Sequence, residues 1–524
     1  MAAQFVVVIY SIVSVNSTSK PDEALYPEAT GSGAGGDIRA IAPQIRILNG
    51  GAIKYRNFSP SSAGSLQLDA TESIQIDGSW IDSRPTFLLS GAFGDGLGAN
   101  AIISTPQLSV VNGAILAAAT YGKGNGGNIT IHTDRVVVDG TTPSRLGSSA
   151  LNTSSFGASN AGTLTLNTRI LTVSNSGGVG SASAGSGNAG RVVVNATESM
   201  VVTGGLTGAL NPTQIRSAVL VPSRLTQQLL GLAAVPSGNA GDITIHTPSL
   251  TVTDGARINV RNEGIGNGGT LQIDADSIRP DNGGSLTATT NLGEGGNIAV
   301  ASGMLVMRRG SSITTTAAGT VGSGGNITIA SPTIVGLENS DIIANAVRGN
   351  GGNINIATQG IFGLENRPQL TPRSDITASS QFGLSGTINV SVLNVNQQNV
   401  VAPHPSNFVS PDQVVASSCA GRQGSSQGTF TIAGNGGLPE TPETRTIPYQ
   451  VVQVASVPTQ SPPSNFQESR GAVSVDTPTW KPGDPIVEAT EFSVNAQGQV
   501  VLTANGNSTA RANAHPQPIL CQPH

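Results

Sequence analysis

Cysteine and charge are both scarce in this sequence. Only two cysteines occur, Cys419 and Cys521, with no C-x-x-C spacing and no nearby group of histidines. We therefore expect no zinc site built on thiolates. The 26 Lys and Arg residues are outnumbered by 31 Asp and Glu, and the formal net charge is -5. Because a nucleic-acid binder needs a basic face that displaces counterions from phosphates, we expect no nucleic-acid partner.

Aromatic residues are rare as well, at 3% of the chain, although 37% of its 524 residues are hydrophobic. Such a chain can bury a large core, which small branched residues must build. The most apolar run, "FVVVIYSIVSV" at residues 5–15, is too short to span a bilayer. A signal peptide has a Lys or Arg before its apolar run and an A-x-A-like cleavage site after it, and this run has neither. It predicts either a strand or a chain start lying inside a longer protein.

Glycine is abundant, at 67 positions, and it is periodic. Gly-Gly or Ala-Gly pairs precede apolar alternations at spacings of about 28 or 35 residues, with one spacing of 51. A period of this length indicates a solenoid, a propeller or another repeat array. The second residues of these pairs, with equivalents at Ala99 and Gly386, are Gly36, Gly64, Gly127, Gly162, Gly190, Gly241, Gly269, Gly296, Gly325 and Gly352.

Each period contains three alternating segments. Between Ala240 and Gly269 they are residues 242–246, 250–253 and 256–260, each with one apolar face. Strict alternation predicts short strands with one buried side. Asp254-Gly255 is placed as a tight corner, because Asx and Gly residues tolerate the positive φ of a sharp turn. The equivalent corners are Asp77-Gly78, Asn112-Gly113 and Asp139-Gly140.

A constant order of strands in every period favours parallel stacking of like on like. We therefore predict an all-β fold, a right-handed parallel β-helix of about twelve three-strand coils over residues 31–398. The asparagines that follow the glycine pairs are expected to stack into an amide ladder. They are Asn128, Asn297, Asn326 and Asn353.

The stretch "GKGNGG" from Gly122 to Gly127 also fits the G-x-G-x-x-G pattern of a dinucleotide-binding turn. In that turn the glycines follow a strand and open a helix, with an acidic residue about twenty positions later. Here "GNGGNITIHT" opens a strand, and similar stretches recur in other periods. We interpret these glycines as corners and expect no cofactor.

The longer periods carry extra residues just after the Asx-Gly corner. These insertions are "SWIDSRP", "TTPSRLG", "LTGALNPTQ" and "LENRPQLTPRS". A second insertion in the longest period, residues 221–238, predicts a short helix with Ser223 as its N-cap. Insertions at one corner form one edge of a solenoid, which is often its binding face. On that edge we predict a possible surface-binding set, against the alternative of loops and arginines that only maintain solubility: Trp80, Arg84, Arg145, Arg367 and Arg373.

The periodicity ends near Leu393. We expect an atypical or truncated start at residues 1–30, a cap segment at 399–437, a Pro-rich linker at 438–485 and a β tail at 486–524. The tail sequence "EFSVNAQGQVVLTA" predicts a strand pair turning at Gln497-Gly498.

The repeats, the closing "SSCAGRQGSSQGTFTIAGNGGLPETP" and the tail "PIVEATEFSVNAQGQVVLTANG" together resemble the C-terminal part of cyanobacterial filamentous-haemagglutinin-like proteins, also labelled S-layer family proteins. The resemblance covers nearly the whole chain. It implies a secreted or outer-surface β-helical protein exported through an outer-membrane transporter of the two-partner type. The family's signal and NPNG-bearing secretion domain have no counterpart here, which puts export of this chain in question. In an oxidising environment Cys419 and Cys521 could pair as a disulfide or stay as free thiols.

Two functions are compatible with this pattern. The first is a non-enzymatic structural or adhesin-like rod, which binds surfaces or glycans through the inserted edge. The alternative is a β-helical polysaccharide lyase or hydrolase, which needs acids, bases or a cation site in one groove. The acidic residues of the repeats lie at corners, where turn chemistry accounts for them; they are Asp37, Asp139, Asp242, Asp254 and Asp341. We therefore expect no enzyme activity, and neither a catalytic nor a metal site.

Overall fold

The computed structural model describes residues 30–78, 86–319 and 322–392 in full. It also gives the backbone of six further strands: β1 (Phe5–Val8), β2 (Val13–Asn16), β3 (Ala24–Leu25), β4 (Glu28–Ala29), β31 (Glu491–Val494) and β32 (Val500–Thr503). The chain divides into two compact units, Met1–Phe408 and Val409–His524. Trp80, Arg84, Cys419 and Cys521 lie outside the described residues, as do the predicted cap and linker.

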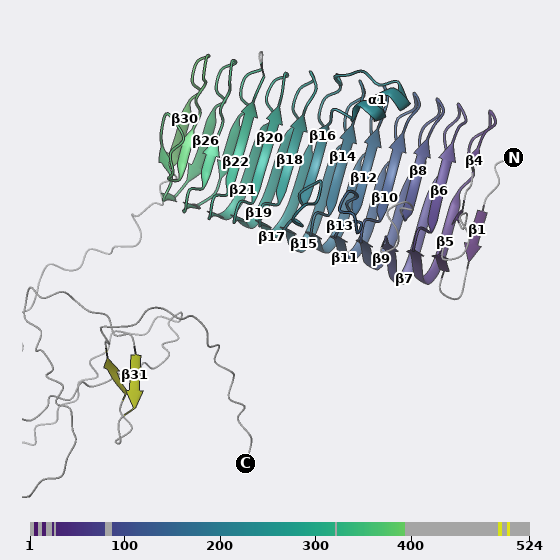
Figure 1. Ribbon diagram of the computed structural model, residues 1–524, viewed down its shortest axis with the longest axis horizontal. Helices are drawn as coiled ribbons and strands as arrows, with labels where there is room; N and C mark the ends of the chain where they lie inside the picture. Colours follow the sequence, from purple (N-terminus) through teal and green to yellow (C-terminus); the bar gives the residue numbers. More distant parts are fainter. Residues whose placement is uncertain are drawn as a thin grey trace, which may run out of the picture. The chain divides into compact units, whose positions relative to one another are not determined.

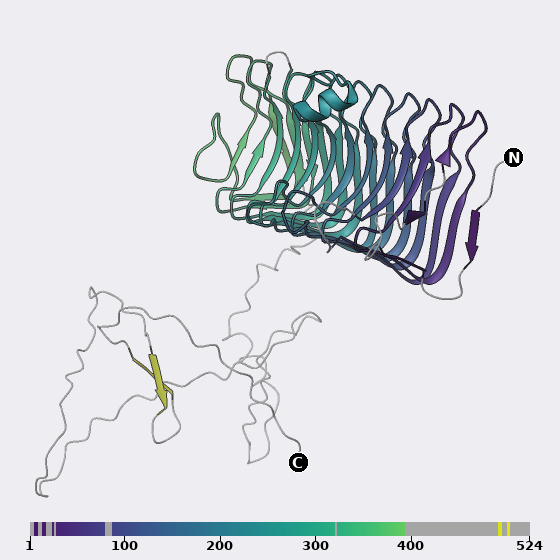
Figure 2. The ribbon, with the colours of Figure 1, turned by 45° about the vertical axis from the view of Figure 1, so that its right-hand side comes forward.

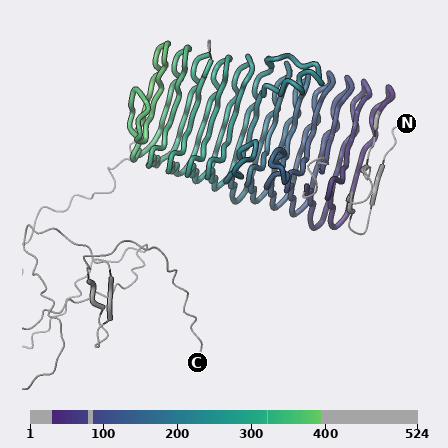
Figure 3. The backbone as a smooth tube through the Cα atoms, in the orientation of Figure 1, coloured from purple at the N-terminus to yellow at the C-terminus, as the bar shows by residue number. Residues whose placement is uncertain are grey.

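The first unit is a parallel β-helix, as predicted (Figure 1). Among the described residues its strands form a 16-stranded sheet of mostly long strands and a 14-stranded sheet of short strands. The chain alternates between the two sheets, so that each coil contributes a strand to both (Figure 2). The path of the larger sheet from β1 to β30 passes through 13 rungs. The Cα trace repeats the same turn along the unit (Figure 3).

The larger sheet, called the long-strand sheet below, begins with β1 and β2 against β5. Its further strands are β5 (Ile38–Leu48), β7 (Ser65–Asp77), β9 (Asn100–Val111), β11 (Ile129–Asp139), β13 (Leu164–Ser174), β15 (Val192–Thr203), β17 (Ile243–Thr253), β19 (Thr270–Asp281), β21 (Asn297–Met307), β23 (Ile327–Ala330), β24 (Thr333–Gly336), β26 (Ile354–Thr358), β27 (Gly360–Phe362) and β30 (Ile388–Val392).

The other sheet, the short-strand sheet, begins with β3 and β4 against β6. Its further strands are β6 (Ala52–Asn57), β8 (Phe87–Ala92), β10 (Ile115–Thr120), β12 (Ala150–Ser155), β14 (Gly178–Ser183), β16 (Gln214–Val219), β18 (Arg257–Asn262), β20 (Ser285–Thr290), β22 (Ser312–Ala317), β25 (Asp341–Ile343), β28 (Glu365–Asn366) and β29 (Asp375–Thr377).

The three-strand coil needs a correction in most of the unit. The strands predicted at residues 242–246 and 250–253 run together as β17, which pairs with β19 on both sides of its bend. The burial pattern changes phase between Thr247 and Leu250, so the strand turns a corner without losing its register. The hydroxyl of Thr247 donates to the carbonyl of Ser249 at 3.3 Å and closes this bend. Three separate strands occur at both ends of the unit, as β1, β2 and β3 in the first coil and as β23, β24 and β25 near the last.

The core is a column of stacked aliphatic side chains. Ile245 is fully buried and lies in register with Val194 of β15 and Ile273 of β19. The 51-residue spacing to Val194 and the 28-residue spacing to Ile273 therefore place equivalent residues side by side, whatever the length of the insertion between them. Burial of such a side chain contributes about 1.5–3 kcal/mol. Each coil thus supplies both a backbone edge and an apolar layer to the next.

The glycine stretches are corners, which confirms the interpretation of "GNGGNITIHT". They lead into β11, and a Cβ atom on Gly124 would lie 2.0 Å from the carbonyl oxygen of Gly96 in the preceding coil. A Cβ atom on Gly127 would lie 1.9 Å from the carbonyl oxygen of Ala99. Backbone of the neighbouring coil fills the space that a side chain would need at these positions.

The predicted asparagine ladder is present in a modified form. Asn326 donates its backbone N–H to Oδ1 of Asn297 at 2.9 Å, and Asn353 donates in the same way to Oδ1 of Asn326 at 2.9 Å. Asn128 accepts from the backbone N–H of Thr163 at 2.7 Å. The side-chain carbonyls thus satisfy backbone donors of the next coil and do not bond amide to amide, because the glycine corner leaves those donors without strand partners.

The Asx-Gly corners agree with the prediction in three of four cases. Asn112 and Asp254 and their following glycines all have positive φ, between 56° and 84°, and Gly140 has φ 81°. Gly78 lies outside this region. Its Cβ would instead lie 2.5 Å from the carbonyl oxygen of Asn112, so close approach of the next coil requires the glycine there.

The described residues include three further predicted elements: the N-terminal apolar run, the strand pair of the tail and the inserted helix. The N-terminal apolar run contains strands, since β1 and β2 pair in parallel with β5. In the second unit, β31 and β32 form the predicted antiparallel pair. In the 51-residue period the predicted helix is α1 (Arg224–Leu230), and the Ser223 hydroxyl accepts from the N–H of Thr226. None of the described helices is long and apolar enough to cross a membrane.

Candidate functional site

The described residues form two large grooves on different sheets. The corner groove, about 850 Å³, follows the bend of the long-strand sheet from β5 to β15. The arginine groove, about 800 Å³, lies on the outer face of the short-strand sheet from β16 to β22. Both run across several coils, so each is built from residues far apart in sequence.

The corner groove is lined by an outward row of polar side chains that occupy the same position in successive coils. Asn195 donates from Nδ2 to Oδ1 of Asn167 at 2.8 Å, and Nδ2 of Asn167 lies 3.5 Å from Nδ1 of His132. At the end of this row, Asp69 lies 3.5 Å from Arg39 and accepts from Gln67 at 2.8 Å. Except for the Gln67–Asp69 bond, which lies within β7, these contacts run along the stacking direction. His246 lies further along this row, 3.7 Å from Asp274.

A row of buried or half-buried threonines forms part of the wall of the corner groove. Thr133 Oγ1 donates to the carbonyl of Arg135 or of Pro106, both at 3.1 Å, and Thr168 lies at the equivalent place in the next coil. Each such hydroxyl satisfies the carbonyl two residues later, where the strand bends. Sequence reasoning missed this role, although Thr105, Thr133, Thr168 and Thr247 share one position of the repeat.

The carboxylate of each of the five corner aspartates accepts a hydrogen bond from a residue of the next coil. Asp242 accepts from the N–H of Thr270 at 2.8 Å, and Asp139 accepts from Ser174 at 2.6 Å and Asn175 at 2.7 Å. Asp37 and Asp341 likewise accept backbone N–H groups one coil away. The predicted corner location is confirmed, but the bonds run between coils rather than within a local turn.

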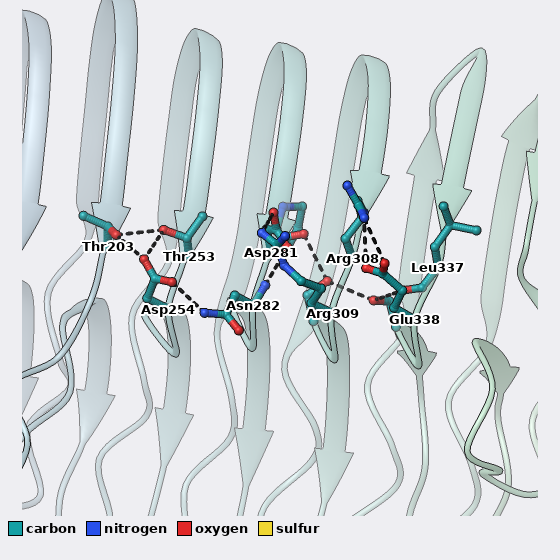
Figure 4. A network of polar contacts seen from close by, with 12 residues as sticks. Thr203, Thr253, Asp254, Asp281, Asn282, Arg308, Arg309, Leu337 and Glu338 are labelled. Carbon is teal, nitrogen blue, oxygen red and sulfur yellow. Dashed lines mark hydrogen bonds and ion pairs between the residues drawn. The ribbon is translucent and has the colours of Figure 1, made fainter. Parts of the chain in front are cut away.

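A polar network occupies the Asx-Gly corners of β15 to β24 (Figure 4). Asp254 accepts from Thr203 at 2.9 Å and from Asn282 at 2.7 Å. Further along, Arg308 binds Glu338 through two hydrogen bonds of 3.2 and 2.8 Å. The Asn282 and Thr203 bonds lower the pKa of Asp254, and the Arg308 bond lowers the pKa of Glu338. These carboxylates are therefore structural groups that favour the charged form.

This network predicts a loss of stability in acid. The folded chain holds Asp254 and Glu338 at pKa values below their ordinary 3.8 and 4.5, so the unfolded chain binds protons more readily. Their stabilisation is present above those ordinary values and is lost as pH falls through the folded pKa values. The measurement is urea unfolding between pH 6 and 3. As pH falls, the free energy of unfolding should decrease less for the double variant Asp254→Asn, Glu338→Gln than for the parent protein.

Because both carboxylates are exposed, the difference between this variant and the parent should be modest and should shrink in 1 M salt. An identical acid decline in the two proteins would contradict the assignment.

The predicted edge residues have different environments. Nη1 of Arg145 donates to the carbonyl of Thr207, and the carbonyl of Arg145 accepts from the N–H of Leu210 at 3.2 Å. Two insertions from different coils are thereby joined. Arg367 forms ion pairs with Glu365 and with the fully buried Asp375.

Burial alone would raise the pKa of Asp375, but hydrogen bonds from Thr371 and Arg367 lower it on balance. Arg367 therefore stabilises its own insertion, and Arg373 is an exposed residue of the same insertion. Arg145, Arg367 and Arg373 all lie at the predicted corner between the two sheets; whether they bind a ligand stays a prediction.

An aromatic stack was also missed by sequence reasoning. Phe58, Phe93, Tyr121 and Phe156 each follow a short strand by one residue, a regular spacing that could have revealed them. Their ring centroids lie 4.9–5.0 Å apart and their planes are nearly parallel. Because each inner ring is covered on both faces by its neighbours, the stack joins coils and does not offer a platform for a flat ligand.

The arginine groove is a third feature that sequence reasoning missed. Its cations are Arg216 of β16 and Arg257 and Arg261 of β18. They occupy the outward positions of β16 and β18, in which apolar and polar residues alternate. From the sequence, such positions indicate only a face exposed to solvent. Only the register of β16 on β18 brings them together.

Comparison of the chain with protein-family models, curated proteins and solved structures found no match. Within the described parts of the chain, no group of three or more His, Cys, Asp or Glu side chains could hold a metal ion. The site is therefore described by its geometry alone: a β-helix with two outward grooves and one edge of insertions.

Proposed function

We propose that this chain is a non-enzymatic structural or adhesin-like rod, which contacts a surface glycan through its edge of insertions. The observation that carries the proposal is the contact between the insertions at residues 141–147 and 206–214. They come from separate coils, yet Arg145 binds both Thr207 and Leu210. Loops that served only as tolerated extra length would not need to be joined, whereas a contact surface gains from being preorganised.

The carboxylates of the repeats also favour binding over hydrolysis. Asp139 and Asp254 each accept hydrogen bonds from residues of neighbouring coils. They are therefore already occupied as parts of the ladder, whereas a glycosidase acid or base must be directed at its substrate. The parallel β-helix is also compatible with a polysaccharide-active enzyme, which stays the alternative.

The same proposal includes the location of the protein outside the cell. The resemblance to filamentous-haemagglutinin-like proteins supports a secreted or outer-surface location and a two-partner transporter as export partner. Export in a host that carries such a transporter, followed by protease treatment of intact cells, would test this location separately from binding.

The binding role can be tested on a glycan array with the full chain. We expect binding to a subset of glycans, and at least about tenfold weaker binding for Arg145→Ala, corresponding to about 1.4 kcal/mol. Removal of Trp80 and Arg84 tests the remainder of the predicted edge. Arg279→Ala, an exposed arginine on the long-strand sheet, is the matched control.

Two results would contradict the proposal: no glycan bound by the parent chain, or shortened polysaccharide products after incubation. New reducing ends or unsaturated sugars would instead favour the enzyme alternative.

A further inference from the structure

Three arginines converge on the outer face of the short-strand sheet. Arg216 lies at the middle of β16, beside Asn259 of β18. Arg257 and Arg261 lie two residues before and after Asn259, so all three side chains leave the same face of the sheet. This arrangement places a triangle of guanidinium groups on two adjacent strands. Like charges at neighbouring positions destabilise a sheet, so packing alone does not account for the triangle.

Only one of the three cations has a carboxylate partner among the described residues. Arg261 forms an ion pair with Glu263, and Glu263 also accepts from the N–H of Val221 at 2.8 Å. The backbone N–H of Arg257 donates to the carbonyl of Thr213 at 3.0 Å, but the side chains of Arg216 and Arg257 form no ion pair or hydrogen bond with the described part of the chain. Burial, and next the charge of Arg261, lower the pKa of Arg216. The groove therefore holds uncompensated positive charge in a chain whose net charge is -5.

Insertions on both edges of the sheet turn this face into a groove. Leu210, Asn211 and Pro212 come from the insertion before β16, while Leu220 and Val221 begin the segment that leads to α1. Figure 1 shows α1 above the ends of the short strands near β12 and β14, so the groove wall is formed by the residues before the helix and not by the helix itself. Walls on two sides reduce the exposure of bound charges to solvent, which strengthens their attraction.

The floor beyond the arginines is a series of hydroxyl groups. Ser285, Thr287 and Thr289 of β20 and Ser312 of β22 line the groove. Thr287 lies in register with Asn259, so the hydroxyls continue the rows that contain the arginines. A ligand along the groove would meet guanidinium donors first and hydroxyl donors and acceptors next.

We propose that the arginine groove binds an acidic saccharide, with its carboxylate or sulfate group between Arg216, Arg257 and Arg261 and its hydroxyl groups along the Ser and Thr side chains. A guanidinium group donates two parallel hydrogen bonds to such an anion, which fixes its orientation. The inference deepens the proposed function, on which it rests, because it names a ligand class and a second contact beside the insertions. A nucleic acid would supply anions too, but the described groove has no aromatic side chain for bases to stack on.

The test is titration calorimetry with the full chain and four ligands: oligogalacturonate, dextran sulfate, neutral dextran and single-stranded DNA. We expect binding of at least one acidic saccharide, no binding of dextran, and weaker binding at higher salt. Arg216→Gln and Arg257→Gln should each weaken binding at least tenfold, whereas Arg279→Gln should not change it. Oligogalacturonate and dextran sulfate distinguish a carboxylated from a sulfated ligand.

Thermal unfolding of each variant checks that the fold is retained. Binding of neither acidic saccharide, equal binding by all variants, or tighter binding of DNA would overturn the inference. The array experiment separates it from the proposed function. If the array shows glycan binding that depends on Arg145 but not on Arg216 or Arg257, the inference about the arginine groove is wrong, whereas the proposed binding through the edge of insertions is supported.

Discussion

Replacing Gly127 with valine should unfold the coils around β11 while leaving distant coils intact. Even the first carbon atom of the new side chain would lie 1.9 Å from the carbonyl oxygen of Ala99, and that oxygen belongs to the backbone of the preceding coil. The coils would have to separate, and the loss of packing and ladder hydrogen bonds should exceed the 1–3 kcal/mol or so that overpacking typically costs. Gly127→Ala should show a smaller loss of the same kind.

Segment-resolved hydrogen exchange is the measurement of choice, because a solenoid is coupled mainly through neighbouring repeats and need not unfold as one unit. Protection should fall in β9, β11 and β13 and persist in β21. Gly33→Val is the matched control, since a Cβ atom on Gly33 would meet nothing within 4 Å. Equal protection in the Gly127 and Gly33 variants would show that close coil stacking does not require the glycine.

Truncation of Ile245 to alanine should lower the free energy of unfolding by about 2–5 kcal/mol. The side chain is fully buried and lies between Val194 and Ile273 in the stacked core. The residual cavity would touch both neighbouring coils, and neither can close it without disturbing its own ladder. Local collapse is thus limited, and the cost should lie toward the upper part of this range.

His246→Ala is the control for this experiment, because the adjacent side chain points outward with 48% of its surface exposed. We expect a change within about 0.5 kcal/mol for that variant. Urea unfolding followed by circular dichroism gives the comparison. Similar destabilisation by the two substitutions would contradict the inward and outward alternation on which the fold depends.

The fold was largely predictable because each coil repeats the same local chemistry. Alternation of Ile243 and Ile245 identified a one-sided strand, and the spacing of the glycine corners identified its stacking partner. The join between the first two strands was not predictable, since Thr247 interrupts the apolar alternation just as a loop would. The hydroxyl of Thr247 bonds to the carbonyl of Ser249 and allows the strand to bend there, a role that the residue type alone does not reveal.

The candidate site was far less accessible to sequence reasoning. The corner that carries the insertions could be located, because extra residues after Asp139-Gly140 must leave the coil at that place. The contact of Arg145 with Thr207 joins residues 62 positions apart, and nothing in either segment indicates the other. Arg367 illustrates the same limit: in sequence it is a loop arginine, whereas in the structure it is paired with the buried Asp375.

By itself, the sequence determined the parallel coil, its aliphatic interior and the places where the coil is interrupted, because alternation, glycine corners and period length act locally and recur. Only the tertiary structure decided which polar side chains meet. Arg216 and Arg257 are separated by the insertion that contains α1, and the pairing of β16 with β18 brings them to one face. Stacking converts distance along the chain into adjacency between coils, and the charge of the arginine groove depends on that adjacency.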